Sequence, residues 1–233
     1  MKKSMDQISS ICEGTDRILW QVYKRSMNNQ SGSESEHLRF PFDRENNIRV
    51  SEQEARFAFV EALIETPVLY SVETPTTKVY QFTGKKEISA MTDLTVYNKH
   101  MDQICRVEFK AKGFSTKRKE LLAVGKDFQK LLREPSDGLW FHILKSVDNS
   151  TINKILSVMA EQIFAVKSNF KDVDSPKLTI HICTLKHNFS IEKEIKVQDF
   201  ENIEELQKCL RIEILVTREK LKEIINPNGW RFH

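Results

Sequence analysis

Two carboxylates and one ammonium group carry the chemistry that this sequence offers. Asp93 lies in the stretch AMTDLTVY, and after fourteen intervening residues Glu108 and Lys110 lie in QICRVEFKAKG. Side chains alternate between the two faces of a strand, so Glu108 and Lys110 project from the same face. Two neighbouring carboxylates repel each other unless a cation lies between them, and this arrangement is how a divalent metal site is made.

Both stretches have the composition of strands, and the polar residues 98–102 between them indicate a hairpin. Pairing in that hairpin would place Asp93 beside the face that carries Glu108 and Lys110. The alternation over 106–112 is equally typical of a half-exposed strand with no function. Asp93 favours the functional interpretation, because aspartate is disfavoured in an apolar, β-branched strand.

Helices are predicted on both sides of these strands. Residues 50–64 begin with a capping box from Ser51 to Glu54, and helical spacing places Glu54 and Glu61 on one face. The simplest roles are a capping carboxylate for Glu54 and a solvated one for Glu61. Residues 115–133 predict a second amphipathic helix, which leads through a turn at 135–138 into an apolar strand over 139–144.

The order helix, strands, helix, strand, with Asp93 and Glu108-x-Lys110, resembles the PD-(D/E)XK nuclease superfamily over residues 50–145. The resemblance implies an α/β fold with a restriction-endonuclease-like core, namely helix, mixed central β-sheet, helix and strand, extended by C-terminal α/β elements. Two positions depart from the pattern. Thr92 replaces the usual proline, and Gln129 is followed four residues later by Arg133 rather than tyrosine, so the RecB-like branch is not supported.

The resemblance implies a metal-dependent endonuclease that hydrolyses phosphodiester bonds, with DNA as the favoured substrate and restriction, defence or DNA processing as its setting. Asp93, Glu108 and the main-chain carbonyl of Phe109 would bind Mg²⁺, for which Mn²⁺ could substitute. Lys110 would position the attacking water, and one of Glu54 and Glu61 would complete the metal shell through water. The alternatives are a catalytically inactive module of the same fold that binds nucleic acid or a protein, and an unrelated α+β interaction protein.

The charge distribution is consistent with a phosphate-bearing partner. The chain carries a net charge of only +3, but residues 106–133 contain nine Lys and Arg residues against three Asp and Glu residues. Such a stretch next to an acidic site suits a nucleic-acid backbone, although a solvated helix face has the same composition. The residues predicted to contact nucleic acid are Lys112, Lys117, Arg118, Lys119, Lys126 and Gln129.

Composition limits the other possibilities. With 39% hydrophobic and 30% charged residues, no long apolar run and no signal-peptide pattern, a cytoplasmic protein without membrane contacts is expected. The four cysteines form no regular framework and predict reduced thiols. His181 and Cys183 could share a strand face, but a buried pair is favoured over a zinc site. A homodimer would bring two active sites to one duplex, but no feature of the sequence requires one.

The predicted organisation is an N-terminal helix (1–27), a polar linker (28–49) and a single domain over 50–233, with the motifs in 50–145. Pro75 is expected to join separate strands at 67–73 and 77–83. The C-terminal part predicts a helix at 151–168, a hairpin of strands 177–185 and 189–197, and short helices at 200–211 and 217–226. The aromatic end, 229–233, is expected to cap the core rather than make a subunit contact.

Overall fold

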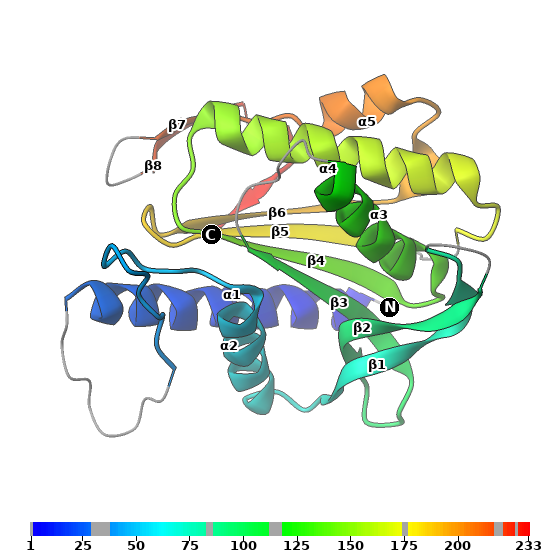
Figure 1. The fold of residues 1–233 in the computed structure, drawn as a ribbon, viewed down its shortest axis with the longest axis horizontal. Helices are drawn as coiled ribbons and strands as arrows, with labels where there is room; N and C mark the ends of the chain where they lie inside the picture. Colours follow the sequence, from blue (N-terminus) through cyan, green and yellow to red (C-terminus); the bar gives the residue numbers. More distant parts are fainter. Residues whose placement is uncertain are drawn as a thin grey trace.

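The computed structural model describes residues 2–28, 38–82, 86–111, 118–173, 177–216, 221–226 and 228–233. A mixed seven-stranded sheet in the order β1-β2-β3-β4-β5-β6-β9 forms its centre (Figure 1). The first three strands form an antiparallel meander, β4 and β5 run parallel to β3, and β6 and β9 are antiparallel again. The strands are β1 Leu69–Tyr80, β2 Ile88–Tyr97, β3 Gln103–Ala111, β4 Asp137–Leu144, β5 Leu178–Thr184, β6 Phe189–Ile195 and β9 Arg231–Phe232.

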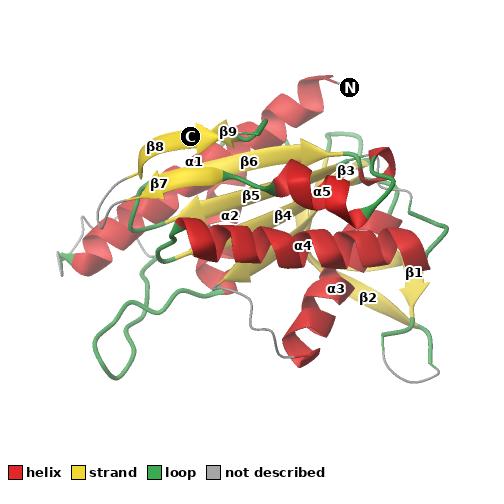
Figure 2. Cartoon of the chain, turned by 90° about the horizontal axis from the view of Figure 1, so that it is seen from above, coloured by secondary structure: helices red, strands yellow, loops and turns green. Residues whose placement is uncertain are grey.

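Helices cover both faces of this sheet, which confirms the predicted α/β class. One face carries α1 (Lys2–Met27) and α2 (Glu52–Ile64), and the other carries α3 (Arg118–Arg133), α4 (Asn149–Asn169) and α5 (Ile203–Leu210) (Figures 1 and 2). A short 3₁₀ turn, η1, spans Val197–Asp199. Parallel strands need a crossover, and α3 and α4 supply the crossovers from β3 to β4 and from β4 to β5.

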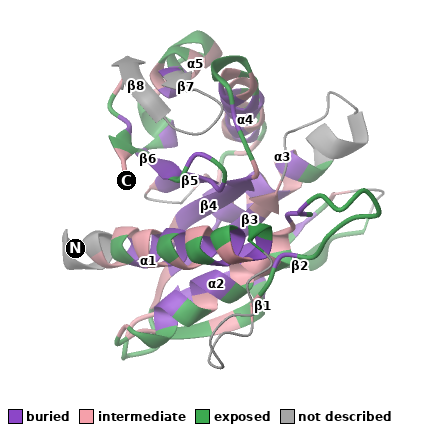
Figure 3. Cartoon of the chain, turned by 90° about the vertical axis from the view of Figure 1, so that its left-hand side faces the viewer, coloured by how far each residue is buried: buried purple, intermediate pink, exposed green. Residues whose placement is uncertain are grey.

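Each sheet face has its own hydrophobic core, and Figure 3 shows β4 and β5 buried between the two. On the side of α1 and α2, Phe59, Phe109 and Phe141 make edge-on or tilted ring contacts with centroids 5.4–6.0 Å apart. On the other side Phe128 of α3 stacks on Trp140 of β4 at 4.3 Å. Because β4 alternates between the two cores, all but the first of its residues are buried, as expected of a central parallel strand.

The N-terminal helix α1 is part of the hydrophobic core on the side of the sheet that carries α2. Ile11, Leu19 and Val22 of α1 lie in the same buried cluster as α2 and the central strands. The predicted linker is described only at 28 and from 38 to 49, and within it Phe40 and Ile48 are also buried in that cluster. The polar loop itself falls almost entirely outside the described residues.

Two sequence-based element predictions are wrong. The segments 67–73 and 77–83 form one strand, β1, whose register shifts between Pro75 and Val79, so the chain does not break at the proline. Proline is tolerated there because β1 is an edge strand. Residues 221–226 form a strand, β8, that pairs with β7 (Glu213–Val216), where a helix was expected. Pairing with the β-branched segment of β7 outweighs the helical spacing of the charged residues.

The remaining elements agree with the sequence. The predicted helices and hairpins are present with shifts of a few residues, and the capping box of Ser51 and Glu54 begins α2. Trp230 is buried in the core next to α4 and α5, which confirms the capping role of the C-terminal segment. All four cysteines are free thiols. Among the described residues, no helix is both long and apolar enough to cross a bilayer.

Candidate functional site

Asp93 lies where β2 separates from β3. The pairing of β2 with β3 begins at Leu94, opposite Val107, whereas the earlier residues of β2 pair only with β1. The backbone N–H of Phe109 therefore has no strand carbonyl opposite it and donates a hydrogen bond to Asp93 Oδ2 (2.9 Å). The carboxylate of Asp93 takes the place of a strand partner, and this explains an aspartate inside an apolar strand.

The second oxygen of Asp93 faces helix α2. Arg56 Nη2 lies 2.8 Å from Asp93 Oδ1, and Arg56 Nη1 lies 3.8 Å from Glu73 Oε1 on β1. Glu73 has a positive φ of 50°, which is rare for a residue with a side chain. It stands between the β1 residues that pair with Thr92 and Leu94, and so opposite Asp93. Backbone strain of this kind clusters at functional sites.

Glu108 is almost completely buried, with 1% of its side chain exposed. Its Oε1 lies 2.7 Å from Lys130 Nζ, and the two buried groups form an ion pair. Burial and the charges of Asp127 and Asp93 raise the pKa of Glu108 well above its usual value, against the opposing effect of Lys130. The ionised form of Glu108 therefore depends on a nearby cation.

Lys110 projects to the same side as Glu108 but makes a different ion pair. Its Nζ lies 2.8 Å from Asp127 Oδ2 and 3.5 Å from Glu52 Oε1. Burial lowers the pKa of Lys110, but Asp127 and Glu52 more than offset this, and the net shift is upward. Lys110 is therefore a permanent cation in this environment and is unsuited to act as a base.

Helix α3 contributes two charged residues that the sequence analysis did not single out. Val124, Phe128, Leu131 and Leu132 bury one face of α3 against the sheet. Asp127 and Lys130, three residues apart, flank that face and form an ion pair at 2.8 Å. The spacing of the apolar residues could have located both groups near the strands, but not their specific partners.

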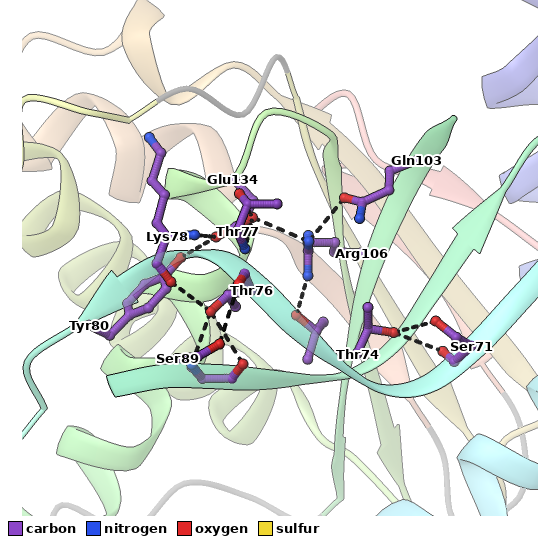
Figure 4. Close-up of polar contacts among 12 residues, drawn as sticks. Ser71, Thr74, Thr76, Thr77, Lys78, Tyr80, Ser89, Gln103, Arg106 and Glu134 are labelled. Carbon is purple, nitrogen blue, oxygen red and sulfur yellow. Dashed lines mark hydrogen bonds and ion pairs between the residues drawn. The ribbon is translucent and has the colours of Figure 1, made fainter. Parts of the chain in front are cut away.

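A second buried ion pair supports the far end of the β1–β2 hairpin (Figure 4). Glu134, directly after α3, lies 3.2 Å from Arg106 Nη2, and both side chains are fully buried. Its two oxygens accept hydrogen bonds from the backbone N–H groups of Thr77 and Lys78 and from the hydroxyls of Thr77 and Tyr80. Arg106 also donates to Thr92, the residue before Asp93. This network ties β1, β2 and β3 to the end of α3 and holds the site in register.

Among the described contacts, the two other candidate glutamates do not pair with Asp93, Glu108 or Lys110. Glu54 Oε2 accepts a hydrogen bond from the backbone N–H of Ser51 at 3.0 Å, as its capping role requires. Glu61 is exposed. The buried face of α2 is formed by Ala55, Ala58, Phe59, Ala62 and Leu63, and Phe57 is 59% exposed. Helical geometry therefore directs Glu52 and Arg56, not Glu54 and Glu61, toward the cluster.

The predicted nucleic-acid contacts are only partly described. Lys112 and Lys117 lie outside the described residues, and so do the side chains of Arg118 and Lys119 at the start of α3. Lys126 lies over the ring of Phe82, 5.2 Å from its centroid, and Gln129 is half-buried. These two residues are on the same helix as Asp127 and Lys130.

A separate polar cluster lies in the core between α1 and the sheet. His181 Nε2 lies 2.9 Å from Asp16 Oδ2, and its Nδ1 lies 3.2 Å from Glu192 Oε2. Burial lowers the pKa of His181, but the two carboxylates more than offset this and raise it to about 9. Cys12, His181 and Glu192 are close enough to hold a metal ion. A protonated imidazole offers no lone pair, so the described geometry is that of a buried imidazolium between carboxylates.

Two hollows in the described surface lie away from the acidic cluster. One, of about 570 Å³, is lined by residues of the loop 43–50 and of the β4–α4 connection, and the other, of about 520 Å³, lies between α4 and α5. Neither is lined by Asp93, Glu108 or Lys110. Asp93 and Lys110 of the cluster are themselves 22% and 19% exposed.

Comparison with known proteins identifies no relative: no family model, no curated protein and no solved structure matches this chain.

Proposed function

We propose that this protein is a metal-dependent nuclease of the PD-(D/E)XK type that hydrolyses phosphodiester bonds. One observation carries the proposal. Asp93 lies where β2 separates from β3, and its carboxylate accepts a hydrogen bond from the backbone N–H of Phe109. Glu108 and Lys110 are the residues on either side of Phe109 in β3. The order of α2, the three-stranded meander, α3 and the parallel strand β4 supports a restriction-endonuclease-like core.

The residues at this position fit a hard divalent cation. Glu108 contributes a buried carboxylate that is paired with a cation, and carboxylate and carbonyl oxygens are the ligands that Mg²⁺ prefers. Asp93, Glu108 and the carbonyl of Phe109 would hold Mg²⁺ or Mn²⁺. A bound metal lowers the pKa of a coordinated water and stabilises the leaving oxygen.

Lys110 would contribute a fixed positive charge. Because its pKa is raised, it stays protonated and can hold the attacking water and offset the charge that develops on the phosphate. Arg56 would hold Asp93 in place through its 2.8 Å ion pair. A nucleic-acid substrate is supported because phosphate contacts dominate the affinity for nucleic acids, and basic residues follow β3 along the chain; DNA is the substrate that the family resemblance implies.

The proposal can be tested with purified protein on supercoiled plasmid, single-stranded DNA and RNA, each with Mg²⁺, Mn²⁺ or EDTA. We expect metal-dependent cleavage that Glu108→Gln and Lys110→Met reduce by roughly 10²–10³-fold or more. Thermal unfolding of each variant would show whether the fold is retained. Equal cleavage by the wild type and both folded variants would contradict the assignment.

A second candidate is a catalytically inactive module of the same fold that binds nucleic acid or a protein partner. It is favoured by the ion pairs of the cluster, because Asp93, Glu108 and Lys110 each already have a counter-charge within the protein. Binding of a nucleic acid without cleavage under any metal condition would support this candidate over the nuclease.

A further inference from the structure

The ammonium group of Lys130 is surrounded by oxygen atoms. Its Nζ lies 2.7 Å from Glu108 Oε1, 2.8 Å from Asp127 Oδ1 and 3.1 Å from the main-chain carbonyl of Met91. The lysine side chain is 10% exposed. Two carboxylates and a carbonyl around one positive charge form the kind of oxygen cage that also suits a divalent cation.

The contact between Lys130 and Glu108 is an ion pair between two buried side chains. Lys130 therefore neutralises the buried carboxylate of Glu108. Met91 belongs to the segment of β2 that has separated from β3, so its carbonyl is not used in pairing with β3. The oxygens are thus held in place by β2, β3 and α3, whereas the lysine reaches them through a flexible four-carbon chain.

We propose that Lys130 is an internal counter-ion that occupies the metal position of this site. A divalent cation enters by displacing its ammonium group from Glu108 and Asp127, and Asp127 then becomes an additional acidic ligand. The released ammonium lies next to the site and becomes a partner for the substrate phosphate. This inference rests on the proposed nuclease function, and it adds a competition between Lys130 and the metal ion that regulates metal binding.

Two effects of Lys130→Met follow. Removing the competing charge should tighten Mn²⁺ binding about 10-fold or more, as expected for loss of a charge-assisted contact. At saturating metal, cleavage should be slower than in the wild type because the phosphate loses a cation. Asp127→Asn should weaken Mn²⁺ binding. Lys154→Met, a matched change at an exposed position of α4, should alter neither property.

The first experiment is calorimetric titration of the wild type and these variants with Mn²⁺. Tighter binding by Lys130→Met than by the wild type and Lys154→Met supports the inference, and equal binding by all three overturns it while leaving the nuclease proposal intact. If neither the wild type nor Lys130→Met binds Mn²⁺, the metal site itself is wrong and the nuclease proposal fails with it.

A second measurement covers the case in which Lys130→Met does not fold. Acetylation of the lysines in the wild type, followed by mass spectrometry, reports the accessibility of each amine. Lys130 should react slowly without metal and faster at saturating Mn²⁺, whereas Lys154 should react equally in both states. No change at Lys130 on metal binding contradicts displacement.

Discussion

At the scale of single residues, the sequence could predict which groups share a strand face but not what surrounds them. Alternation in β3 placed Glu108 and Lys110 on the side of Asp127 and Lys130, whereas Asp93 contacts the backbone of Phe109 and Arg56 of α2. Asp127 and Lys130 were not identified, because their role depends on how α3 crosses β3, which no local pattern specifies. Glu54 and Glu61 were candidates because they share a helix face, but the helix turns its other side to the core.

A residue-scale prediction concerns His181. Its folded pKa of about 9 lies above the unfolded value of 6.5, so its contribution to stability is fully present below pH 6.5 and is lost as pH rises through 9. The free energy of unfolding should fall by on the order of 1–2 kcal/mol between pH 6.5 and 8. Urea unfolding at a series of pH values measures this fall.

Two histidine variants test whether His181 causes this loss of stability with rising pH. His181→Gln should abolish the decline, whereas His187→Gln should preserve it. Burial lowers the pKa of His187, so its own effect on stability appears as pH falls below 6.5. An unchanged decline in His181→Gln would show that the imidazolium is not its source.

At the scale of elements, the contact between β1 and the end of α3 was not predictable. Glu134 and Thr77 are far apart in the sequence, and β1 itself was expected to break at Pro75. The strand continues because the backbone N–H groups of Thr77 and Lys78 find acceptors in the carboxylate of Glu134. The predicted helix at 217–226 failed for a different reason, since residues 221–226 pair with the neighbouring strand β7 in a local antiparallel hairpin.

The element-scale prediction is that Glu134→Ala destabilises the fold by roughly 3–5 kcal/mol, because it leaves Arg106 buried and unpaired. The four groups that donate to Glu134 lose their acceptor in the same variant. Equilibrium urea unfolding measures the loss. Glu161→Ala, at an exposed position of α4, serves as the control and should stay within about 0.5 kcal/mol of the wild type. Similar stability of the two variants would mean that the network contributes little.

At the scale of the whole molecule, the positive charge of 106–133 divides into two groups. Arg106, Lys110, Lys130 and Arg133 form ion pairs with carboxylates of the protein, so their charge is neutralised before a metal or substrate binds. Of the basic residues of this segment whose side chains are described, Lys126 remains for a nucleic acid; it lies over the ring of Phe82. Counting charges in the sequence therefore overestimates the positive surface.

The whole-molecule prediction is that DNA binding weakens steeply with salt and that the combined variant Lys117→Gln, Arg118→Gln, Lys119→Gln lowers the salt slope by up to about 3. Fluorescence anisotropy with a labelled duplex, over a range of NaCl concentrations, gives the slope. Lys154→Gln should leave it unchanged. A slope that is flat in the wild type would mean that this surface does not bind phosphate.

The most direct test of the central claim is the initial rate of plasmid cleavage in Mg²⁺ by the wild type, Asp93→Asn and Asp199→Asn. Asp199 is an exposed aspartate in η1 and serves as the matched control. We expect cleavage by the wild type and the control, abolished by EDTA, and a loss of at least about 10²-fold in Asp93→Asn. Cleavage at the wild-type rate by a folded Asp93→Asn protein would contradict the account.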